Sequence, residues 1–328
     1  MLRRHLTDVR AATRTRVQQW IENGHITVNG RSVRRTAARA ALGDVVAVDI
    51  PVRDEATGIT PMAAENVPLE VLYEDHDLLV LNKPAGVVVH PSYRNTTGTT
   101  MNALLWHARG WPAGQRPSLV GRLDKGTSGI LLVARTAASH AALQRAMTSR
   151  ETEKDYLGVV YGHVNVARGK IDLRLGHDPA DRRRMLASPT IGAPSLTWFE
   201  RLARVAAPRA GLALVRCRLD TGRTHQIRAH LSARGWPLVG DLKYGEPRWS
   251  GIVDPVLAAT LRAFARPALH AFRLAFIHPV TRSRVVLEAP LPRDFEDLLS
   301  AARLPTFNAQ SHVSSLESHQ TSALRLDP

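Results

Sequence analysis

The chain has 328 residues, enough for about two domains of roughly 150 residues each. Its apolar fraction of 44% and charged fraction of 22% are typical of a folded globular protein with a sizeable core, so a small disulfide-rich scaffold is excluded. The single cysteine, Cys217, excludes an internal disulfide and a zinc site of the CxxC type, and it fits a reducing compartment.

The charge of the chain favours a polyanionic partner or an anionic membrane surface. The net charge of +15 comes from 44 Lys and Arg residues against 29 Asp and Glu residues. Most of the basic residues are arginine, whose planar fork suits phosphates and bases. No apolar run reaches the ~18–20 residues that a membrane span needs, and the N-terminus lacks the apolar region of a secretory signal. We therefore predict a cytoplasmic protein with no membrane partner.

Residues 1–50 form the first predicted unit, a small basic α/β module with nine arginines and four acidic residues. Val17 and Trp20 share one face of an expected helix, an Asn-Gly pair at 29–30 predicts a hairpin turn, and a final strand follows. We expect a basic face that binds RNA, although a solvated charged surface is the alternative interpretation. The candidate residues for this face are Arg14, Arg16, Arg34 and Arg35.

The rest of the chain divides into a linker, a main domain and a tail. Residues 51–67 hold two prolines and no periodicity, which predicts a linker. Residues 68–303 mix strands and helices without a regular βαβ repeat, which predicts an α+β domain with a mixed, largely antiparallel sheet. Residues 304–328 have little apolar content and predict a disordered tail. We expect strands at 71–73, 78–81, 87–90, 118–120, 130–133, 156–161 and 212–219, and helices at 136–148 and 225–233.

Several kinds of site are excluded by the pattern of residues. The chain has neither GxxxxGK[ST] nor GxGxxG, so phosphate-loop and dinucleotide sites are not indicated. His225 and His230 lie about 140° apart around a helix, so they do not form a chelating pair. We predict neither a metal nor a cofactor.

The segment 121–135, GRLDKGTSGILLVAR, places one carboxylate on a short glycine-bearing turn between two apolar strands. This carboxylate, Asp124, follows Arg122 by two residues and precedes the hydroxyl side chains of Thr127 and Ser128. The functional interpretation is a carboxylate presented by a braced loop, and the alternative is an ordinary turn aspartate.

The segment 221–245, TGRTHQIRAHLSARGWPLVGDLKYG, is the second region with concentrated polar residues. Arg223 and Arg228 lie on either side of His225 and Gln226, near the start of the expected helix. A basic helix N-terminus without further function is the alternative interpretation.

Together the two segments resemble the RluA/RluD-type family of pseudouridine synthases, which modify large-subunit ribosomal RNA or tRNA. The R-L-D-x-x-T-S-G signature is met at 122–129, and G-R-T-H-Q-I-R-x-H-L at 222–231 is followed by G-W-P-L-V-G-D-x-x-Y-G at 235–245. The stretches 74–91 and 154–162 also match the family, and residues 1–50 resemble the alpha-L RNA-binding module that precedes many members. Gly121 replaces a histidine common in this family and is frequent in the small-subunit branch, but the second signature favours the large-subunit branch.

The resemblance implies the pseudouridine synthase fold and an isomerisation that needs no cofactor or metal. Such a reaction requires a carboxylate near the sugar, a dry pocket and a flipped nucleotide. The resemblance makes Asp124 the catalytic carboxylate, as nucleophile or as base. Arg228 would pair with Asp124 and keep it ionised and oriented, with Arg223 as the alternative for that role.

The resemblance also implies roles for the residues around the carboxylate. Tyr156 would stack on the target base and could act in proton transfer, with core packing as the alternative. Arg122 would fill the gap that the flipped base leaves, and Leu123 and Ile227 would form apolar walls.

Three classes of function remain open at this point. The leading hypothesis is an RNA pseudouridine synthase that acts as a monomer. Its expected substrate is large-subunit ribosomal RNA, with tRNA as the alternative. A non-catalytic RNA-binding or ribosome-assembly protein would not need Asp124, Tyr156 and Arg228. A glycosidase-like hydrolase would need two carboxylates about 5–9 Å apart, and we expect no second acid beside Asp124.

Overall fold

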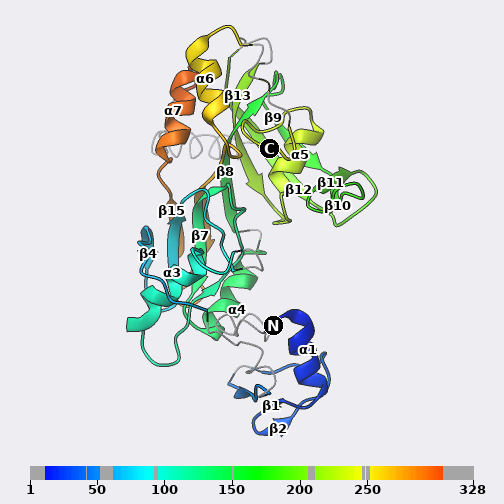
Figure 1. The fold of residues 1–328 in the computed structure, drawn as a ribbon, viewed down its shortest axis with the longest axis vertical. Helices are drawn as coiled ribbons and strands as arrows, with labels where there is room; N and C mark the ends of the chain where they lie inside the picture. The colour runs from blue at the N-terminus through cyan, green and yellow to red at the C-terminus, as the bar shows by residue number, and fades with distance from the viewer. Residues whose placement is uncertain are drawn as a thin grey trace, which may run out of the picture.

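The computed structural model describes residues 12–41, 43–51, 62–91, 95–149, 151–205, 211–245, 248 and 252–305. It has the predicted α+β architecture: a large mixed sheet with helices packed on it, preceded along the chain by a small α/β unit (Figure 1). Within the described ranges, none of the helices combines the length and the apolar content needed to cross a bilayer.

The N-terminal unit has the predicted order of helix, hairpin and strand. Its apolar core is formed by Val17, Trp20 and Ile26, which are almost completely buried. The hairpin turns at Asn29 and Gly30, both at positive φ, as the Asn-Gly pair predicts. The elements are α1 (Arg14–Glu22), β1 (Ile26–Val28), β2 (Arg31–Ser32) and β3 (Val46–Val48), with the antiparallel strand order β2-β1-β3.

The main domain is built on a ten-stranded sheet, whose strands lie between Val71 and Glu288. Its strand path is β4-β5-β7-β14-β8-β13-β12-β9, with β15 added to β14 and β6 added to β7. The β7–β14 pair is parallel and its other pairs are antiparallel. Its strands are β4 (Val71–Glu74), β5 (Leu78–Lys83), β6 (Ser118–Leu119), β7 (Ser128–Ala134), β8 (Glu153–Tyr161), β9 (Arg168–Asp172), β12 (Leu196–Val205), β13 (Leu212–Leu219), β14 (Leu269–Ile277) and β15 (Arg284–Glu288). A separate antiparallel hairpin consists of β10 (Arg174–His177) and β11 (Met185–Ser188).

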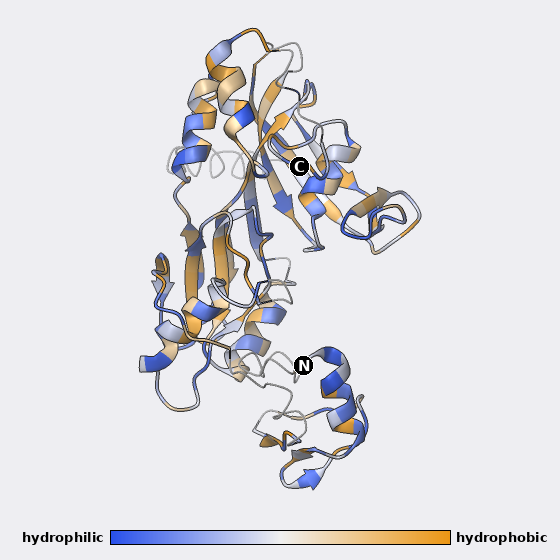
Figure 2. Ribbon diagram, viewed as in Figure 1, coloured by the Kyte–Doolittle hydropathy of each residue, from blue (hydrophilic) through white to orange (hydrophobic). Residues whose placement is uncertain are grey.

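Helices cover both faces of the sheet at β5 and β7, and the ribbons of these two strands are largely orange, the colour of hydrophobic residues, in Figure 2. All seven residues of β7 are buried, as expected for a strand that is covered on both faces. The helices are α3 (Thr100–His107), the 3₁₀ turn η2 (Ala108–Gly110), α4 (Ala137–Ala146), α5 (Gln226–Ala233), α6 (Pro255–Ala263) and α7 (Arg293–Ala301).

The two helices α3 and α4 pack on opposite faces of strands β5 and β7. Leu104 of α3 belongs to one apolar cluster with Leu79 and Leu131. Leu143 of α4 belongs to another, which contains the next residue of each strand, Val80 and Leu132. Because successive side chains of a strand point to opposite faces, the two clusters form a separate core on each side of the sheet.

One predicted strand, at 87–90, is wrong. The carbonyls of Val88 and Val89 accept hydrogen bonds from the N–H groups of Thr100 and Met101, the first two residues of α3. N–H groups in the first turn of a helix have no partner within that helix. Here they bind the carbonyls of Val88 and Val89, which are therefore not available to a neighbouring strand. This apolar segment therefore packs against a helix N-terminus and does not extend the sheet.

The other predicted elements of the main domain are confirmed with small changes in their ends, and several elements were not predicted, namely β9 to β12, β14, β15, α3, α6 and α7. Within the predicted linker, residues 52–61 lie outside the described residues. The segment that follows is attached to α3, because the Asn102 side chain donates to the carbonyl of Ala63 and the Asn102 backbone carbonyl accepts from Glu65 N–H. In the predicted tail, residues 306–328 also lie outside the described residues.

A buried lysine holds the turn after β5. Lys83 is 1% exposed, and its Nζ donates to the carbonyls of Pro84 (2.6 Å), Val87 (3.0 Å) and Lys125 (3.5 Å). Burial, together with the charge of Arg266, lowers the pKa of Lys83 from 10.5 to about 8. The lysine thus ties the turn at 84–87 to the loop that precedes β7.

Gly129 in β7 allows a very close backbone approach in the centre of the sheet. Its φ is +109°, and a Cβ at this position would lie 2.2 Å from the carbonyl oxygen of Ala271 in β14. We predict that Gly129→Ala lowers the free energy of unfolding by at least about 2 kcal/mol, because backbone strain and a backbone clash combine. Urea unfolding measures this loss, with Gly110→Ala, whose added Cβ meets nothing within 4 Å, as the control. Equal stabilities of the two variants would contradict the prediction.

The burial of Lys83 predicts a pH dependence of stability. Below pH 8 the lysine is protonated in both the folded and the unfolded chain, and the folded chain carries the cost of burying the charge. Between pH 8 and 10.5 the folded chain loses this proton while the unfolded chain keeps it, so the unfolded state binds more protons and stability rises with pH.

The measurement is the difference in unfolding free energy between wild type and Lys83→Met, determined in urea from neutral pH to the usual pKa of a lysine side chain, 10.5. We expect the difference, wild type minus variant, to increase above pH 8. Lys170→Met, at an exposed position of β9, is the matched control. A difference that stays constant or falls above pH 8 would show that the burial of Lys83 does not set its proton affinity.

Candidate active site

A cleft of about 1380 Å³ is lined mainly by residues of the main domain. Asp124 lines it from the loop between β6 and β7, Tyr156 from β8, and Arg223 from the loop before α5. Ala271 and Arg273 of β14 complete the wall between these elements. The two segments that the sequence singles out therefore face the same cleft, although they lie far apart along the chain.

The loop that carries Asp124 is held by its backbone. Thr127 N–H donates to the carbonyl of Asp124, and Gly86 N–H donates to the carbonyl of Lys125 at 2.7 Å. Arg266 Nη1 donates to the carbonyl of Gly126 at 3.3 Å. With Lys83 also directed at the carbonyl of Lys125, the backbone of the loop is fixed from several sides and the carboxylate of Asp124 is left to project into the cleft.

Helix α5 is anchored to the sheet by a buried glutamine at its first residue. Gln226 donates from Nε2 to the carbonyl of Leu196 and to Thr197 Oγ1, and its Oε1 accepts from Thr221 Oγ1 and Arg223 N–H. Ile227 then packs into the apolar cluster on this side of the sheet. The next residue, Arg228, is directed to another side of the helix, toward the loop of Asp124.

Arg228 lies between two carboxylates. Its Nη1 donates to Asp124 Oδ2 at 2.8 Å, and its Nε and Nη2 donate to the two oxygens of Asp241 at 2.6 and 2.8 Å. The ring of Tyr244 packs on the guanidinium, 5.0 Å from its central carbon to the ring centre. Burial alone would lower the pKa of Arg228, but the hydrogen bonds and charges of Asp241 and Asp124 raise it above the usual value. The guanidinium is therefore a fixed positive charge that orients Asp124.

Tyr156 lies half-buried on β8, in register with Cys217 of β13 and Ala271 of β14. It packs at the edge of the apolar cluster that includes Ile227. Burial, with the nearby charge of Asp124, raises the pKa of Tyr156 to about 12. The phenol keeps its proton at neutral pH, and its ring is available at the wall of the cleft.

The remaining predicted residues of the cleft occupy its rim and walls. Arg122 is exposed and donates from Nη2 to Thr224 Oγ1 at 2.9 Å, which joins the two signature loops. Leu123 is half-buried against the cluster that includes Leu131. Arg223 is exposed at the cleft, and the ion pair with Asp124 is made by Arg228 in its place.

The four candidate arginines of the N-terminal unit do not line this cleft. Arg14, Arg34 and Arg35 are exposed, whereas Arg16 is half-buried. Among the described residues of this unit, Ala12 and Thr13 line the cleft. The predicted basic face thus lies outside the described cleft, and its role in binding RNA stays a prediction.

Sequence reasoning missed Asp241 and Tyr244. The expectation that no second acid accompanies Asp124 is corrected, because Asp241 shares Arg228 with it. Both Asp241 oxygens are bound to Arg228, so this carboxylate is a counter-ion and not a second acid free to react. Both residues stand in the matched stretch 235–245, and a charged residue shortly after an apolar run was the available signal.

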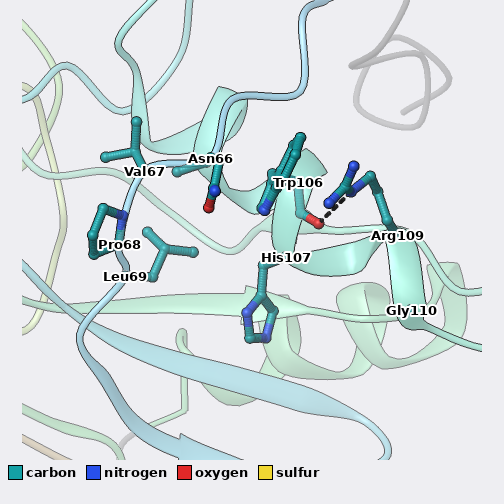
Figure 3. A pocket seen from close by; sticks show the side chains of 9 residues that line it. Asn66, Val67, Pro68, Leu69, Trp106, His107, Arg109 and Gly110 are labelled. Carbon is teal, nitrogen blue, oxygen red and sulfur yellow. Dashed lines mark hydrogen bonds between the residues drawn. The ribbon is translucent and has the colours of Figure 1, made fainter.

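A smaller pocket of about 420 Å³ lies between the extended segment 66–69 and helix α3 (Figure 3). Arg109 packs over the ring of Trp106, 3.1 Å from the ring centre, and its Nε donates to the carbonyl of Trp106 at 3.3 Å. None of the residues discussed for the main cleft lines this pocket. It is therefore separate from the candidate active site.

One trio of described residues has the spacing of metal ligands, namely Asp75, Asp77 and His278, whose ligand atoms lie within 4.8 Å of one another. The carboxylate of Asp75 accepts from Tyr73 OH and from the N–H groups of Asp77 and Leu78, and it faces His278 Nε2 at 3.0 Å. These contacts hold Asp75 in the turn between β4 and β5 and place it beside His278, which follows β14.

Comparison with known proteins identifies the family. Residues 77–233 match the RNA pseudouridylate synthase family, and residues 10–46 match the S4 domain family. A ribosomal large subunit pseudouridine synthase D of Vibrio vulnificus is 37% identical over 301 residues, which are 92% of this chain and 89% of that protein. The protein of the same name from Xylella fastidiosa is 41% identical over 295 residues, 89% of this chain and 85% of that protein.

A solved structure agrees with these relatives. Human RNA pseudouridylate synthase domain containing 1 is 28% identical, with a TM-score of 0.58 over 80% of this chain and 98% of that chain. The resemblance read from the two signatures and from residues 1–50 is thereby confirmed. The chain belongs to the RNA pseudouridylate synthase family, whose members isomerise uridine in RNA to pseudouridine.

Proposed function

We propose that the chain converts specific uridines of large-subunit ribosomal RNA to pseudouridine, with Asp124 as the reacting carboxylate. The choice of RNA is supported by relatives named ribosomal large subunit pseudouridine synthase D, which align with about nine-tenths of this chain. The alignment covers far more than the segment matched by the synthase family alone.

The observation that carries the role of Asp124 is its ion pair with Arg228 on the wall of the cleft. The guanidinium holds Oδ2 at 2.8 Å and is itself fixed by Asp241. If Asp124 only shaped the loop, its carboxylate would accept hydrogen bonds from the backbone of the loop. The loop is instead held by hydrogen bonds to the carbonyls of Lys125 and Gly126. Asp124 lines the cleft, and this supports its proposed contact with a bound nucleotide.

The isomerisation breaks the bond between N1 of uracil and C1′ of ribose and forms a bond between C5 and C1′. The base loses the proton at C5 and gains one at N1, so the reaction is neither a redox step nor a hydrolysis. Both roles open to Asp124, nucleophile and general base, use a carboxylate oxygen near the sugar. Tyr156, protonated at neutral pH, would stack on the base and could donate a proton to it.

The wider surface fits an RNA substrate. We assign Arg122 to the space that the flipped base leaves, Leu123 to an apolar wall, and Arg223 to a phosphate contact at the rim. Ile227 is 3% exposed and does not line the cleft, so it supports the wall from the apolar cluster against which Tyr156 packs. The exposed Arg14, Arg34 and Arg35 would neutralise phosphates farther along the RNA, with Arg16 beside them. A monomeric state and a cytoplasmic location stay predictions.

Mapping pseudouridine in total RNA tests the proposed substrate. Cells without the gene for this chain should lack pseudouridine at particular sites of large-subunit ribosomal RNA, and the wild-type gene should restore these sites. The Asp124→Asn gene should not restore them, although its protein accumulates to the same level. Loss of sites from tRNA instead would establish the alternative substrate, and no loss from either RNA would favour a binding protein without catalysis.

The purified Asp124→Asn variant separates catalysis from binding. Its turnover, measured as tritium release from RNA labelled at C5 of uridine, should fall below detection, because no other carboxylate in the loop can replace Asp124. RNA affinity, measured by filter binding, should hold or rise slightly, since an anion facing a polyanion is removed. A folded variant that still isomerises uridine would exclude Asp124 as the reacting group.

Two substitutions of Tyr156 separate its ring from its hydroxyl. Base stacking on an aromatic ring is worth about 1–3 kcal/mol, so Tyr156→Leu should weaken RNA binding while Tyr156→Phe keeps it. If the hydroxyl takes part in proton transfer, Tyr156→Phe should bind RNA normally and turn it over slowly in the tritium assay. Near-wild-type binding and turnover of both variants would place Tyr156 outside the reaction.

A further inference from the structure

His225 occupies a strained position directly beside the ion pair of Asp124 and Arg228. Its backbone is left-handed, with φ 54° and ψ 22°, which is uncommon for a residue other than glycine. It precedes α5 as the N-cap residue, yet its side chain makes no capping hydrogen bond. Helix capping therefore does not explain the direction of the side chain. Strained backbone positions of this kind cluster at functional sites.

The imidazole is held by a hydrogen-bonded chain that begins at the β10–β11 hairpin. Met185 N–H donates to Tyr244 OH at 2.6 Å, and Tyr244 OH lies 2.8 Å from His225 Nδ1. The tyrosine and histidine rings also meet edge to face, with their centres 5.5 Å apart. Since the Tyr244 oxygen already accepts from Met185, its own proton is available to donate to His225 Nδ1.

The other imidazole nitrogen faces the proposed catalytic carboxylate. Nε2 of His225 lies 3.7 Å from Asp124 Oδ2, the same oxygen that Arg228 binds. With Nδ1 accepting from Tyr244, the neutral ring carries its proton on Nε2. This tautomer presents an N–H to the carboxylate, whereas the other would present a lone pair to a negative oxygen.

We propose that His225 is a positioning residue for Asp124, whose Nε2–H closes on Oδ2 when RNA binds and leaves Oδ1 as the oxygen that reacts. The proposal rests on the catalytic role proposed for Asp124. The present 3.7 Å is too long for a hydrogen bond, and a movement of less than about 1 Å would bring it into range. Catalytic hydrogen bonds are often long without substrate and shorten in its complex.

The charges around His225 are consistent with a neutral ring. Burial, and then the charges of Arg228 and Lys243, lower the pKa of His225, while Asp124 and Asp241 act in the opposite direction. Tyr244 also faces the ring, and burial raises its pKa, so its hydroxyl stays protonated as a donor. The arrangement therefore needs no change of protonation at neutral pH.

The test compares two replacements of His225 in the full-length chain. Asn tolerates the left-handed backbone well, but its amide ends near the place of Nδ1 and does not reach Asp124. Gln is less suited to this backbone, but its longer side chain can carry an N–H to the place of Nε2. We expect His225→Asn to reduce single-turnover tritium release about tenfold to a hundredfold with unchanged RNA affinity, and His225→Gln to recover part of the rate.

A role limited to the backbone predicts the reverse order, with His225→Asn at least as fast as His225→Gln. That order, or a His225→Asn rate close to that of wild type, would overturn the proposal. RNA affinity is measured by filter binding and folding by thermal unfolding. The variants are assayed on an RNA from which the wild-type chain releases tritium. If the wild-type chain released none from large-subunit ribosomal RNA, that result would contradict the proposed substrate and would not bear on His225.

Tyr244→Phe supplies a second variant that keeps the ring on Arg228. Removing the hydroxyl should slow release several-fold, because Nδ1 loses the donor that fixes the tautomer. In combination with His225→Asn it should add nothing, since Tyr244 acts through His225. An unchanged rate for Tyr244→Phe, or additive losses in the double variant, would overturn the proposal even if His225→Gln recovered part of the rate.

Discussion

The site depends on one buried positive charge shared by two carboxylates. Arg228 is 7% exposed, and a guanidinium at that depth is stable only with partners in good geometry. Asp241 accepts two of its hydrogen bonds from within the fold, and Asp124 accepts the third at the wall of the cleft. Because removal of one partner from such a pair typically costs about 3–5 kcal/mol, the same contact serves both the fold and the orientation of Asp124.

The sheet brings the parts of this site to fixed positions. Ala271 of β14 lies between Gly129 of β7 and Tyr156 of β8 in the strand register. The loop of Asp124 ends just before Gly129, so one strand sets the position of both proposed reacting groups. Ser128 and His270 join the same region of β7 and β14 by a side-chain hydrogen bond of 2.9 Å. The missing side chain of Gly129 is therefore a requirement of the active-site spacing as well as of the sheet.

The sequence predicted those features that depend on local patterns or on whole motifs. The Asn-Gly hairpin, the helix that begins at Gln226 and the pair of Asp124 with Arg228 belong to this group. The role of Asp241 was missed because it contacts Arg228 only in the folded chain, where the backbone reverses direction at Gly235, whose φ is +77°. At 87–90 a run of three valines predicted a strand, but the carbonyls of Val88 and Val89 accept hydrogen bonds from the start of α3. Such competition between distant partners leaves no local mark in a sequence.

The ion pair between Asp124 and Arg228 affects how strongly the site repels an approaching RNA phosphate. Two unit charges about 4 Å apart interact by about 1 kcal/mol in water and about 4 kcal/mol at the effective dielectric near a protein surface. An RNA phosphate approaching Asp124 would meet repulsion of this order if the carboxylate were unpaired. Arg228 lies within hydrogen-bonding distance of Asp124 but is shared with Asp241, so it offsets the charge of Asp124 only in part. The candidate residues Arg14, Arg16, Arg34 and Arg35 lie outside the cleft. The net charge of +15 favours the approach of RNA, and the ion pair with Arg228 lowers the repulsion between a phosphate and the proposed catalytic carboxylate.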